Sequence, residues 1–288
     1  MSTLDSRTST SPVHETALYG AQLGRRVTFR DLLEAKVHGQ HWPMLTSYDA
    51  ITARLFDSLG VPVLLVGDSA ATVVYGYDTT IPVTVDDLLP LVRAVVRGSS
   101  QAMVVADLPF GSYQSSVSTA IHTAGRFIKE GGAHAVKLEG GQRVVPQVRA
   151  LVEAGIPVMA HVGLTPQSVH ALGGYKVQGR GDDAQRIIDD ALALQDAGAF
   201  SVVLEVIPAD LAAKITAALT IPTIGIGAGV NTDAQVLVWQ DLVGLTPGAT
   251  PKFVKPYAQV GDIIASAVST WCDDVVNLRY PSTEQSYK

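Results

Sequence analysis

Three carboxylates in the middle of the chain stand at the ends of short apolar runs, an arrangement that suits a metal ion. The runs, each with the carboxylate that ends it, are residues 63–66 with Asp68, residues 103–106 with Asp107, and residues 135–138 with Glu139. Such runs are typical of buried parallel strands, and α/β folds bind ligands where these strands end. Carboxylates brought together in a dry site repel one another and resist ionisation. Because a hard divalent cation removes that conflict, we expect the three to surround Mg²⁺.

Further polar side chains at strand ends are candidates for chemistry. Lys137 stands two residues before Glu139, so the period of a strand points both to one face. If the sheet closes into a barrel, that face is the interior, where a lone lysine is costly. We therefore expect Lys137 near the mouth, paired with an anion; a plain buried Lys–Glu ion pair is the alternative. His161 is either a donor or acceptor toward a substrate or a core histidine, and Glu205 is either a fourth carboxylate near the metal or a general base.

These side chains need a parallel sheet to bring them together, and the alternation along the chain predicts one. Apolar runs alternate with helical segments from residue 43 onward. Strands are expected at residues 43–46, 61–66, 103–106, 135–138, 156–160, 201–204, 223–226 and, more weakly, 242–245. Eight such units predict an α/β fold of the (β/α)8 TIM barrel type. A doubly wound open sheet is the alternative, which the lack of a GxGxxG motif after the first strand disfavours.

Capping signals and loops complete the outline of the fold. Thr28 and Asp31 form a capping box that starts a short N-terminal helix ending near residue 37. Helices are also expected at residues 50–59, 86–98, 116–130, 144–154, 184–197 and 263–277. Residues 69–84 and 162–183 form long loops, which in compact domains are usually functional. We expect residues 1–27 to be a polar, flexible tail and residues 28–288 to form a single barrel domain.

Composition narrows the class of protein. The net charge of −6 and the lack of a basic stripe argue against a nucleic-acid partner. The single cysteine, Cys272, excludes an intramolecular disulfide and fits a reducing cytoplasm, where we expect the protein. No run reaches the roughly 18 apolar residues of a membrane span.

Eight stretches of the chain, taken in order, resemble motifs of the ketopantoate hydroxymethyltransferase family. They are residues 45–49 (LTSYD), 65–69 (LVGDS), 105–110 (VADLPF), 136–141 (VKLEGG), 161–168 (HVGLTPQS), 173–180 (GGYKVQGR), 204–205 with Pro208, and 224–229 (IGIGAG). They fall within residues 42–255, and so many ordered matches make the resemblance specific.

This resemblance implies both a fold and a reaction. The fold is a barrel of the phosphoenolpyruvate mutase and isocitrate lyase type, assembled as a homodecamer. The reaction transfers a hydroxymethyl group from 5,10-methylenetetrahydrofolate to 3-methyl-2-oxobutanoate through a Mg²⁺-stabilised enolate, giving 2-dehydropantoate for pantothenate and coenzyme A synthesis. By the family's pattern, the metal positions match Asp68, Asp107 and Glu139, the substrate contacts match Asp68, Ser69, Asp107 and Lys137, and the proton acceptor matches Glu205, with His161 assisting.

The chain departs from the family pattern in two places. Residues 233–235 read Asp-Ala-Gln where Asp-Gly-Gln is expected, and residues 284–287 read Glu-Gln-Ser-Tyr where Glu-His-Ser-Phe is expected. Both lie outside the expected metal shell. They put local loop and C-terminal geometry in doubt, and with it the folate contacts.

Two other functions compete with this interpretation. One is a Mg²⁺-dependent C–C lyase or mutase of the same superfamily acting on another 2-oxo acid, which the motif at residues 173–180 argues against. The other is a non-catalytic barrel kept for binding or assembly, because fold alone does not dictate function. Loss of a metal ligand or of Lys137 would favour that second alternative, and all of these residues are present.

Overall fold

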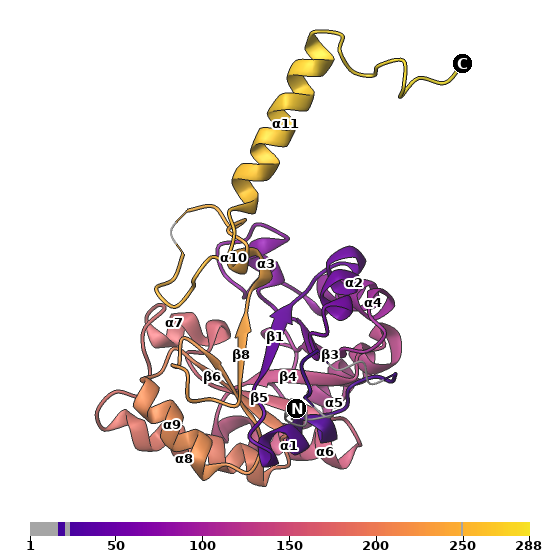
Figure 1. Ribbon diagram of the computed structural model, residues 1–288. Coiled ribbons are helices and arrows are strands. Elements are labelled where there is room, and N and C mark those ends of the chain that lie inside the picture. The colour runs from indigo at the N-terminus through magenta and orange to yellow at the C-terminus, as the bar shows by residue number, and fades with distance from the viewer. Residues whose placement is uncertain (1–16, 21–23, 249) are drawn as a thin grey trace, which may run out of the picture.

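A closed barrel of parallel strands forms the centre of the protein (Figure 1). The computed structural model describes residues 17–20, 24–248 and 250–288. The strands follow one another in chain order around the barrel, and β8 closes it against β1. They are β1 (Trp42–Thr46), β2 (Val63–Val66), β3 (Met103–Asp107), β4 (Ala135–Glu139), β5 (Val158–Gly163), β6 (Ser201–Glu205), β7 (Thr223–Ile226) and β8 (Ala234–Leu237). The (β/α)8 prediction is confirmed, and the open doubly wound sheet is excluded.

The helices lie outside the barrel, and all but α11 stay close to it (Figure 1). They are α1 (Phe29–Val37), α2 (Ala50–Ser58), α3 (Ala70–Val73), α4 (Val85–Gly98), α5 (Val117–Arg126), α6 (Val145–Glu153), α7 (Val169–Leu172), α8 (Asp183–Asp196), α9 (Ala209–Ala218), α10 (Trp239–Leu242) and α11 (Val260–Val276). Short turns add η1 (Phe127–Gly131), η2 (Gln142–Val144) and η3 (Pro166–Ser168). The two predicted long loops therefore contain the short helices α3 and α7.

The strand wall separates two hydrophobic cores because side chains alternate between its faces. Met44, Leu65 and Met159 belong to the inner core, which fills the barrel. Leu64 and Val104, one residue out of step with the inner set, belong to the larger core between strands and helices. The acidic side chains Asp107 and Glu139 stand at the C-terminal ends of their strands, where the inner core stops.

The predicted capping box is present at the start of α1. The backbone N–H of Thr28 donates to the Asp31 carboxylate at 2.7 Å, which satisfies one of the free donors at this helix end. The Lys36 ammonium, in the last turn of α1, lies 2.8 Å from the Asp233 carboxylate. Asp233 in turn accepts from the backbone of Thr223 at the start of β7. The short N-terminal helix is confirmed, and it covers the end of the barrel where the strands begin.

The described part of the N-terminal segment packs against this same end of the barrel. Leu18 and Val27 are buried, and the Arg26 guanidinium donates to the Ala102 carbonyl at 2.6 Å. Residues 1–16 lie outside the described residues, so the domain boundary at residue 28 stays a prediction.

The predicted eighth strand at residues 242–245 is wrong. The closing strand is β8, which pairs with β1 from Ala234 opposite Trp42 to Leu237 opposite Leu45. Its residues alternate between buried and more exposed positions, so it lacks the continuous apolar run that marks the other strands. Residues 242–245 instead end α10 and form the turn after it. The helix α9, between β6 and β7, had no predicted counterpart.

Helix α11 projects away from the barrel (Figure 1). None of its 17 residues is buried, and Trp271 has 53% of its surface exposed. In the described part of the chain, no helix combines the length and apolar character that crossing a membrane requires. A long, exposed helix with large apolar side chains is typical of a surface covered by another protein chain.

The half-buried His134 gives the fold a pH-dependent contact at the start of β4. Its ring Nδ1 accepts from the backbone N–H of Val104 at 3.0 Å. Burial, together with the nearby Arg26 charge, lowers its pKa from 6.5 to about 4. The unfolded chain binds this proton more readily than the folded chain does. The contribution of the neutral His134 contact to the stability of the fold is therefore complete above about pH 6.5 and is lost as the pH falls toward 4.

We expect His134→Asn to remove that pH dependence, since the amide oxygen can accept the same bond without titrating. Between pH 7 and pH 4, the free energy of unfolding of the unmodified chain should fall by about 1 to 2 kcal/mol more than that of the variant, after allowance for solvent screening. Urea unfolding followed by circular dichroism at both pH values measures the difference. Equal losses in the two proteins would refute a role for this histidine.

Candidate active site

The register of the strands brings the candidate side chains to one level inside the barrel. Asp107 on β3 lies opposite Lys137 on β4, and Glu139 on β4 lies opposite His161 on β5. All four are almost fully buried, with at most 4% of their surfaces exposed. The carboxylates Asp107 and Glu139 are the last residues of their strands, so they stand where the inner core gives way to the barrel mouth.

Lys137 is the cation at the centre of this cluster. Its ammonium lies 2.9 Å from the Asp107 carboxylate and 4.0 Å from that of Glu139. Burial alone would lower its pKa, but the charges of Asp107, Glu139 and Asp68 outweigh burial and raise it. The lysine is therefore charged and buried among acidic groups, and its close partner is Asp107 instead of the Glu139 of the simple ion-pair alternative.

Asp68 and Ser69 enter the cluster from the end of β2. The backbone N–H of Asp68 donates to Asp107 Oδ2 at 3.2 Å, which links the two strand ends. The Ser69 hydroxyl shares a 2.8 Å hydrogen bond with the buried Tyr48 hydroxyl, and the chain then turns into α3. The sequence prediction assigned no role to Tyr48, which orients the serine toward the same cavity.

His161 lies between two carboxylates. Its Nδ1 is 3.4 Å from Glu139, and its Nε2 is 3.3 Å from Glu205, the last residue of β6. Burial and the charge of Lys137 both lower the pKa of His161, but the contacts with Glu139 and Glu205 outweigh them and raise it to about 9. The histidine can thus hold a proton within reach of Glu205. His161 contacts side chains, so it is not the core histidine of the alternative interpretation.

Gln167 is a buried residue that the sequence prediction missed. Its backbone N–H donates to Glu139 at 3.1 Å, and its side-chain amide donates to Asp68 at 3.0 Å. The oxygen of this side-chain amide accepts from the Tyr113 hydroxyl at 2.8 Å. Gln167 stands within the family-like stretch at residues 161–168, which was the available signal. It therefore ties two of the expected metal ligands together from outside the cluster.

We expect Gln167→Ala to weaken Mg²⁺ binding by roughly tenfold, as losses of such supporting bonds usually do. The reason is that Asp68 loses the side-chain donor that orients it, while the backbone N–H of residue 167 still reaches Glu139. Isothermal titration with MgCl₂ measures the affinity without relying on turnover, and Gln185→Ala, an exposed glutamine on α8, serves as the control. An unchanged affinity in Gln167→Ala would show that the glutamine supports the fold alone.

A cavity of about 460 Å³ opens above the cluster at the barrel mouth. All the candidate residues line it: Asp68, Ser69, Asp107, Lys137, Glu139, His161 and Glu205. Its walls are largely apolar, with Val203, Ile226 and Phe253 among them, and Tyr175 reaches it from the second long loop. Such a cavity accommodates a small molecule whose polar end meets the charged floor.

The acidic groups on the floor lack sufficient positive charge. Burial raises the pKa of Asp68 well above its usual range, and the charges of Asp107 and Glu139 add to this effect. Burial also raises the pKa of Asp107, with Lys137 opposing. Asp107 Oδ1 and Glu139 Oε1 are buried oxygens without a hydrogen-bond donor, which is costly unless a ligand satisfies them.

The donor types fit a hard divalent cation, since these oxygens suit Mg²⁺. Among the residues that the structure describes, however, no three His, Cys, Asp or Glu side chains already stand in an arrangement that could hold a metal. The ammonium of Lys137 takes the place beside Asp107. The site thus matches Mg²⁺ by chemistry and by its unpartnered oxygens, while the side chains are arranged around the lysine.

Two other sequence features are explained by their place in the fold. A side chain at Gly227 would press against Phe253 at 2.9 Å, so the glycines after β7 permit close packing at the cavity wall. The departure at residues 233–235 lies at the start of β8, where Asp233 bonds Thr223. That is the opposite end of the barrel from the carboxylates, so this departure does not touch the cavity.

Comparisons with known proteins agree with this geometry. The sequence profile described as "Ketopantoate hydroxymethyltransferase" matches residues 26–283. A 3-methyl-2-oxobutanoate hydroxymethyltransferase of Frankia alni is 63% identical over 262 residues, which cover 91% of this chain and 86% of that protein. The protein of the same name from Rhodococcus jostii is 58% identical, with coverage of 98% of this chain and 99% of that protein.

Solved structures with similar folds have far lower sequence identity. Phosphonopyruvate hydrolase in complex with oxalate and Mg²⁺ has a TM-score of 0.57 at 13% identity, covering 90% of this chain and 93% of that one. A 2,3-dimethylmalate lyase of the PEP mutase/isocitrate lyase superfamily has a TM-score of 0.55 at 16% identity, covering 90% and 91%. At this identity the likeness establishes the type of barrel alone.

Proposed function

Because this chain belongs to the ketopantoate hydroxymethyltransferase family, we propose that the buried cluster at the barrel mouth carries out the family's reaction. The chain acts as a 3-methyl-2-oxobutanoate hydroxymethyltransferase in pantothenate biosynthesis, with a folate as the one-carbon donor. The observation that carries the assignment of the site is the convergence of Lys137, three carboxylates and the His161–Glu205 pair on the floor of one cavity.

We assign Mg²⁺ to Asp68, Asp107 and Glu139, and the unpartnered buried oxygens of Asp107 and Glu139 support the choice. When bound, the cation supplies a Lewis acid that polarises the 2-oxo group of the substrate. Mn²⁺ or Co²⁺ can serve in its place, because ligand type alone discriminates poorly among these ions.

The side chains of the protein hold the substrate and move its proton. Lys137, a buried ammonium, attracts the substrate carboxylate as a point charge, and the Ser69 hydroxyl donates to it. Glu205 takes the proton from C3, which leaves an enolate, and the protonated His161, 3.3 Å from Glu205, can supply a proton in return. Since the apolar cavity wall excludes water, these charges act strongly on the substrate.

The carbon–carbon bond then forms to the one-carbon unit. The C3 carbon of the enolate forms a bond to the methylene carbon that 5,10-methylenetetrahydrofolate supplies. The oxygen of a water molecule replaces the folate nitrogen on that carbon, so the C–N bond breaks, the nitrogen takes up a proton, and tetrahydrofolate leaves the hydroxymethyl group behind. The cavity of about 460 Å³ suits the small oxo acid. Tyr175, on the second long loop, also lines this cavity.

The first test is proton NMR of 3-methyl-2-oxobutanoate in D₂O, with the protein and Mg²⁺ but no folate. Loss of the C3 proton signal shows the enolate half-reaction directly, and adding 5,10-methylenetetrahydrofolate should then yield 2-dehydropantoate. No exchange by folded, metal-loaded protein would contradict the roles assigned to Glu205 and Lys137. Exchange without product on addition of folate would instead favour the lyase or mutase alternative.

We further propose that the chain forms a homo-oligomer, a decamer by family resemblance, in the cytoplasm. Ile264, Val268, Trp271 and Val275 lie at helical spacing along one face of α11 and are all substantially exposed. A second exposed apolar row, Ile51, Leu55 and Leu59, runs along α2 and its end. Two such rows on one chain support a contact in which α11 is buried against a second copy of the chain.

We expect Trp271→Asp to lower the mass of the assembly measured by light scattering coupled to size-exclusion chromatography. A buried carboxylate in an apolar contact between chains is strongly unfavourable, whereas the barrel should stay folded because α11 contributes no buried residue. Ser269→Asp, on the opposite face of the helix, is the matched control. A monomeric unmodified chain, or the same mass in both variants, would rule out this contact.

A further inference from the structure

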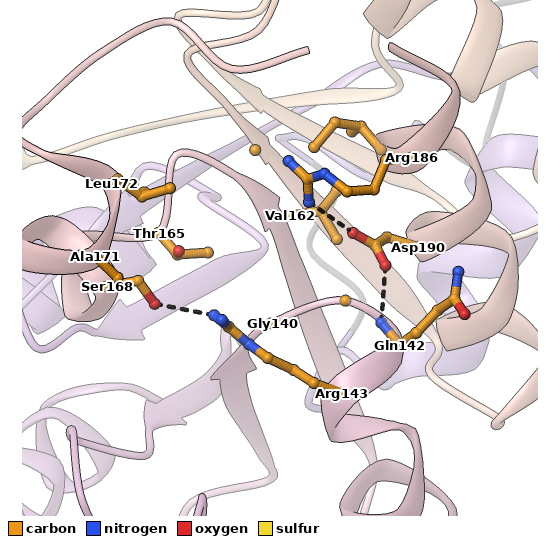
Figure 2. A pocket seen from close by; sticks show the side chains of 13 residues that line it. Gly140, Gln142, Arg143, Val162, Thr165, Ser168, Ala171, Leu172, Arg186 and Asp190 are labelled. Carbon is orange, nitrogen blue, oxygen red and sulfur yellow. Dashed lines mark hydrogen bonds and ion pairs between the residues drawn. The ribbon is translucent and has the colours of Figure 1, made fainter. Parts of the chain in front are cut away.

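A second cavity, of about 200 Å³, lies outside the strand wall at the same end of the barrel (Figure 2). It is enclosed by the loop after β4, by the loop after β5 with α7, and by the first half of α8. Val162, whose side chain belongs to the outer core, forms its inner wall. The catalytic residues are absent from its lining, so it is separate from the cavity at the barrel mouth.

The charges around this cavity leave one arginine without a counter-ion. Arg186 is matched by Asp183 at 2.6 Å and by Asp190 at 3.2 Å. Arg143, on the other side of the cavity, donates to the Ser168 hydroxyl at 2.9 Å (Figure 2) and has no ion pair with a carboxylate among the described residues. A guanidinium held by a neutral hydroxyl retains most of its capacity to bind an oxyanion.

The wall that carries Arg143 is anchored to α8. The Asp190 carboxylate accepts from the backbone N–H of Gln142 at 2.8 Å (Figure 2). This approach requires glycine at residue 141, because a Cβ there would overlap the carboxylate. Asp190 thus holds the loop in place and partly neutralises Arg186, while Arg143 stays at the cavity.

We propose that this cavity binds a small oxyanion, a carboxylate or a phosphate, through the Arg143 guanidinium. The hydroxyl of Ser168, beside the guanidinium, and that of Thr165 also line the cavity and add neutral donors. A planar guanidinium is well suited to the recognition of carboxylate and phosphate.

Binding in this cavity has a direct route to the catalytic site. Ser168 is the last residue of η3, and the residue before it is Gln167, which bonds Glu139 and Asp68. An anion that takes the Arg143 donor from Ser168 changes the restraint on this turn. The bound anion therefore alters the affinity of the Asp68–Glu139 pair for Mg²⁺; this second step rests on the proposed function of the cluster, whereas the binding itself does not.

The test is isothermal titration of the full-length chain with inorganic phosphate and, separately, with succinate. The titrations contain no 3-methyl-2-oxobutanoate, because this oxo acid is itself a carboxylate and would compete for the cavity, and chloride holds the ionic strength constant. We expect about one anion per chain, with affinity lowered at least about tenfold by Arg143→Gln and unchanged by Arg149→Gln, which removes the same charge from an exposed position on α6. Lack of saturable binding of both anions, or equal binding by Arg143→Gln, overturns the site.

The link to catalysis is measured separately. The Mg²⁺ concentration that half-saturates C3 proton exchange should shift by at least about twofold when the better-binding anion is added. That shift should be absent in Arg143→Gln. Anion binding without a shift in the half-saturating Mg²⁺ concentration would overturn the coupling to catalysis but not the anion site itself. A protein that binds the anion but catalyses no exchange refutes the proposed function of the cluster and not the anion site.

Discussion

Removal of the divalent cation should lower the rate of C3 proton exchange by more than about a hundredfold, the largest effect we expect. The enolate places negative charge next to three carboxylates, of which Asp68 and Asp107 already have raised pKa values. Lys137 alone cannot balance that charge. Exchange is followed by proton NMR in D₂O after treatment with EDTA and gel filtration, and Mg²⁺ is then added back to restore the rate.

A ligand variant separates loss of the metal from damage to the protein. Asp107→Asn keeps the volume of the side chain but removes one charge from the proposed metal site, so its half-saturating Mg²⁺ concentration should rise by roughly ten- to a hundredfold. Its unfolding temperature is measured alongside, because Lys137 loses its 2.9 Å partner. Full exchange by protein shown to be metal-free by elemental analysis would exclude Mg²⁺ from the mechanism.

Replacing Glu205 by glutamine should lower C3 proton exchange by roughly 10² to 10⁴, the range for loss of a general base. The amide has nearly the same shape, and the only close polar partner of the side chain in the described structure is His161, so folding should be preserved. Glu205→Asp keeps the carboxylate but shortens its reach, so its rate of C3 proton exchange should lie between those of the unmodified chain and Glu205→Gln. Full turnover by Glu205→Gln would remove Glu205 as the base.

The same variant decides between the two roles that the sequence left open for Glu205. If Glu205 is a general base, Glu205→Gln should leave the Mg²⁺ affinity measured by titration calorimetry unchanged. If Glu205 is a fourth carboxylate of the metal site, the same variant should bind Mg²⁺ more weakly, because a ligand has been removed. The position of Glu205, next to His161 and two strands beyond Glu139, favours the base.

Much of the active site follows from local sequence pattern. The strands that carry Asp107, Lys137 and Glu139 are continuous apolar runs, because both faces of a parallel strand are buried. Polar residues at the ends of such runs have to lie at one end of the barrel, since all the strands point the same way. The period of two also placed Lys137 and Glu139 on one face, as observed.

The same logic explains the error at the last strand. β8 has a shorter and alternating pattern, with Gln235 exposed, because residues 227–233 bring the chain back to the start of the barrel without forming a covering helix. The stronger apolar run at residues 242–245 packs in a turn instead. Which of two neighbouring segments closes the barrel depends on its pairing with β1, and that pairing joins residues nearly 200 positions apart.

Long-range contacts also decided the finer structure of the site. Lys137 pairs with Asp107 because strand register sets them side by side, whereas the sequence predicted an anionic partner without identifying it and left a pair with Glu139 as the alternative. Gln167 becomes part of the site through bonds to Asp68, 99 residues away, and to Glu139. Residue type and spacing thus identified the strands, the direction of the sheet and the acidic cluster, because those depend on local burial and periodicity. The pairing inside the cluster, its supporting glutamine and the exposed α11 required the folded chain, because each depends on which distant segments meet.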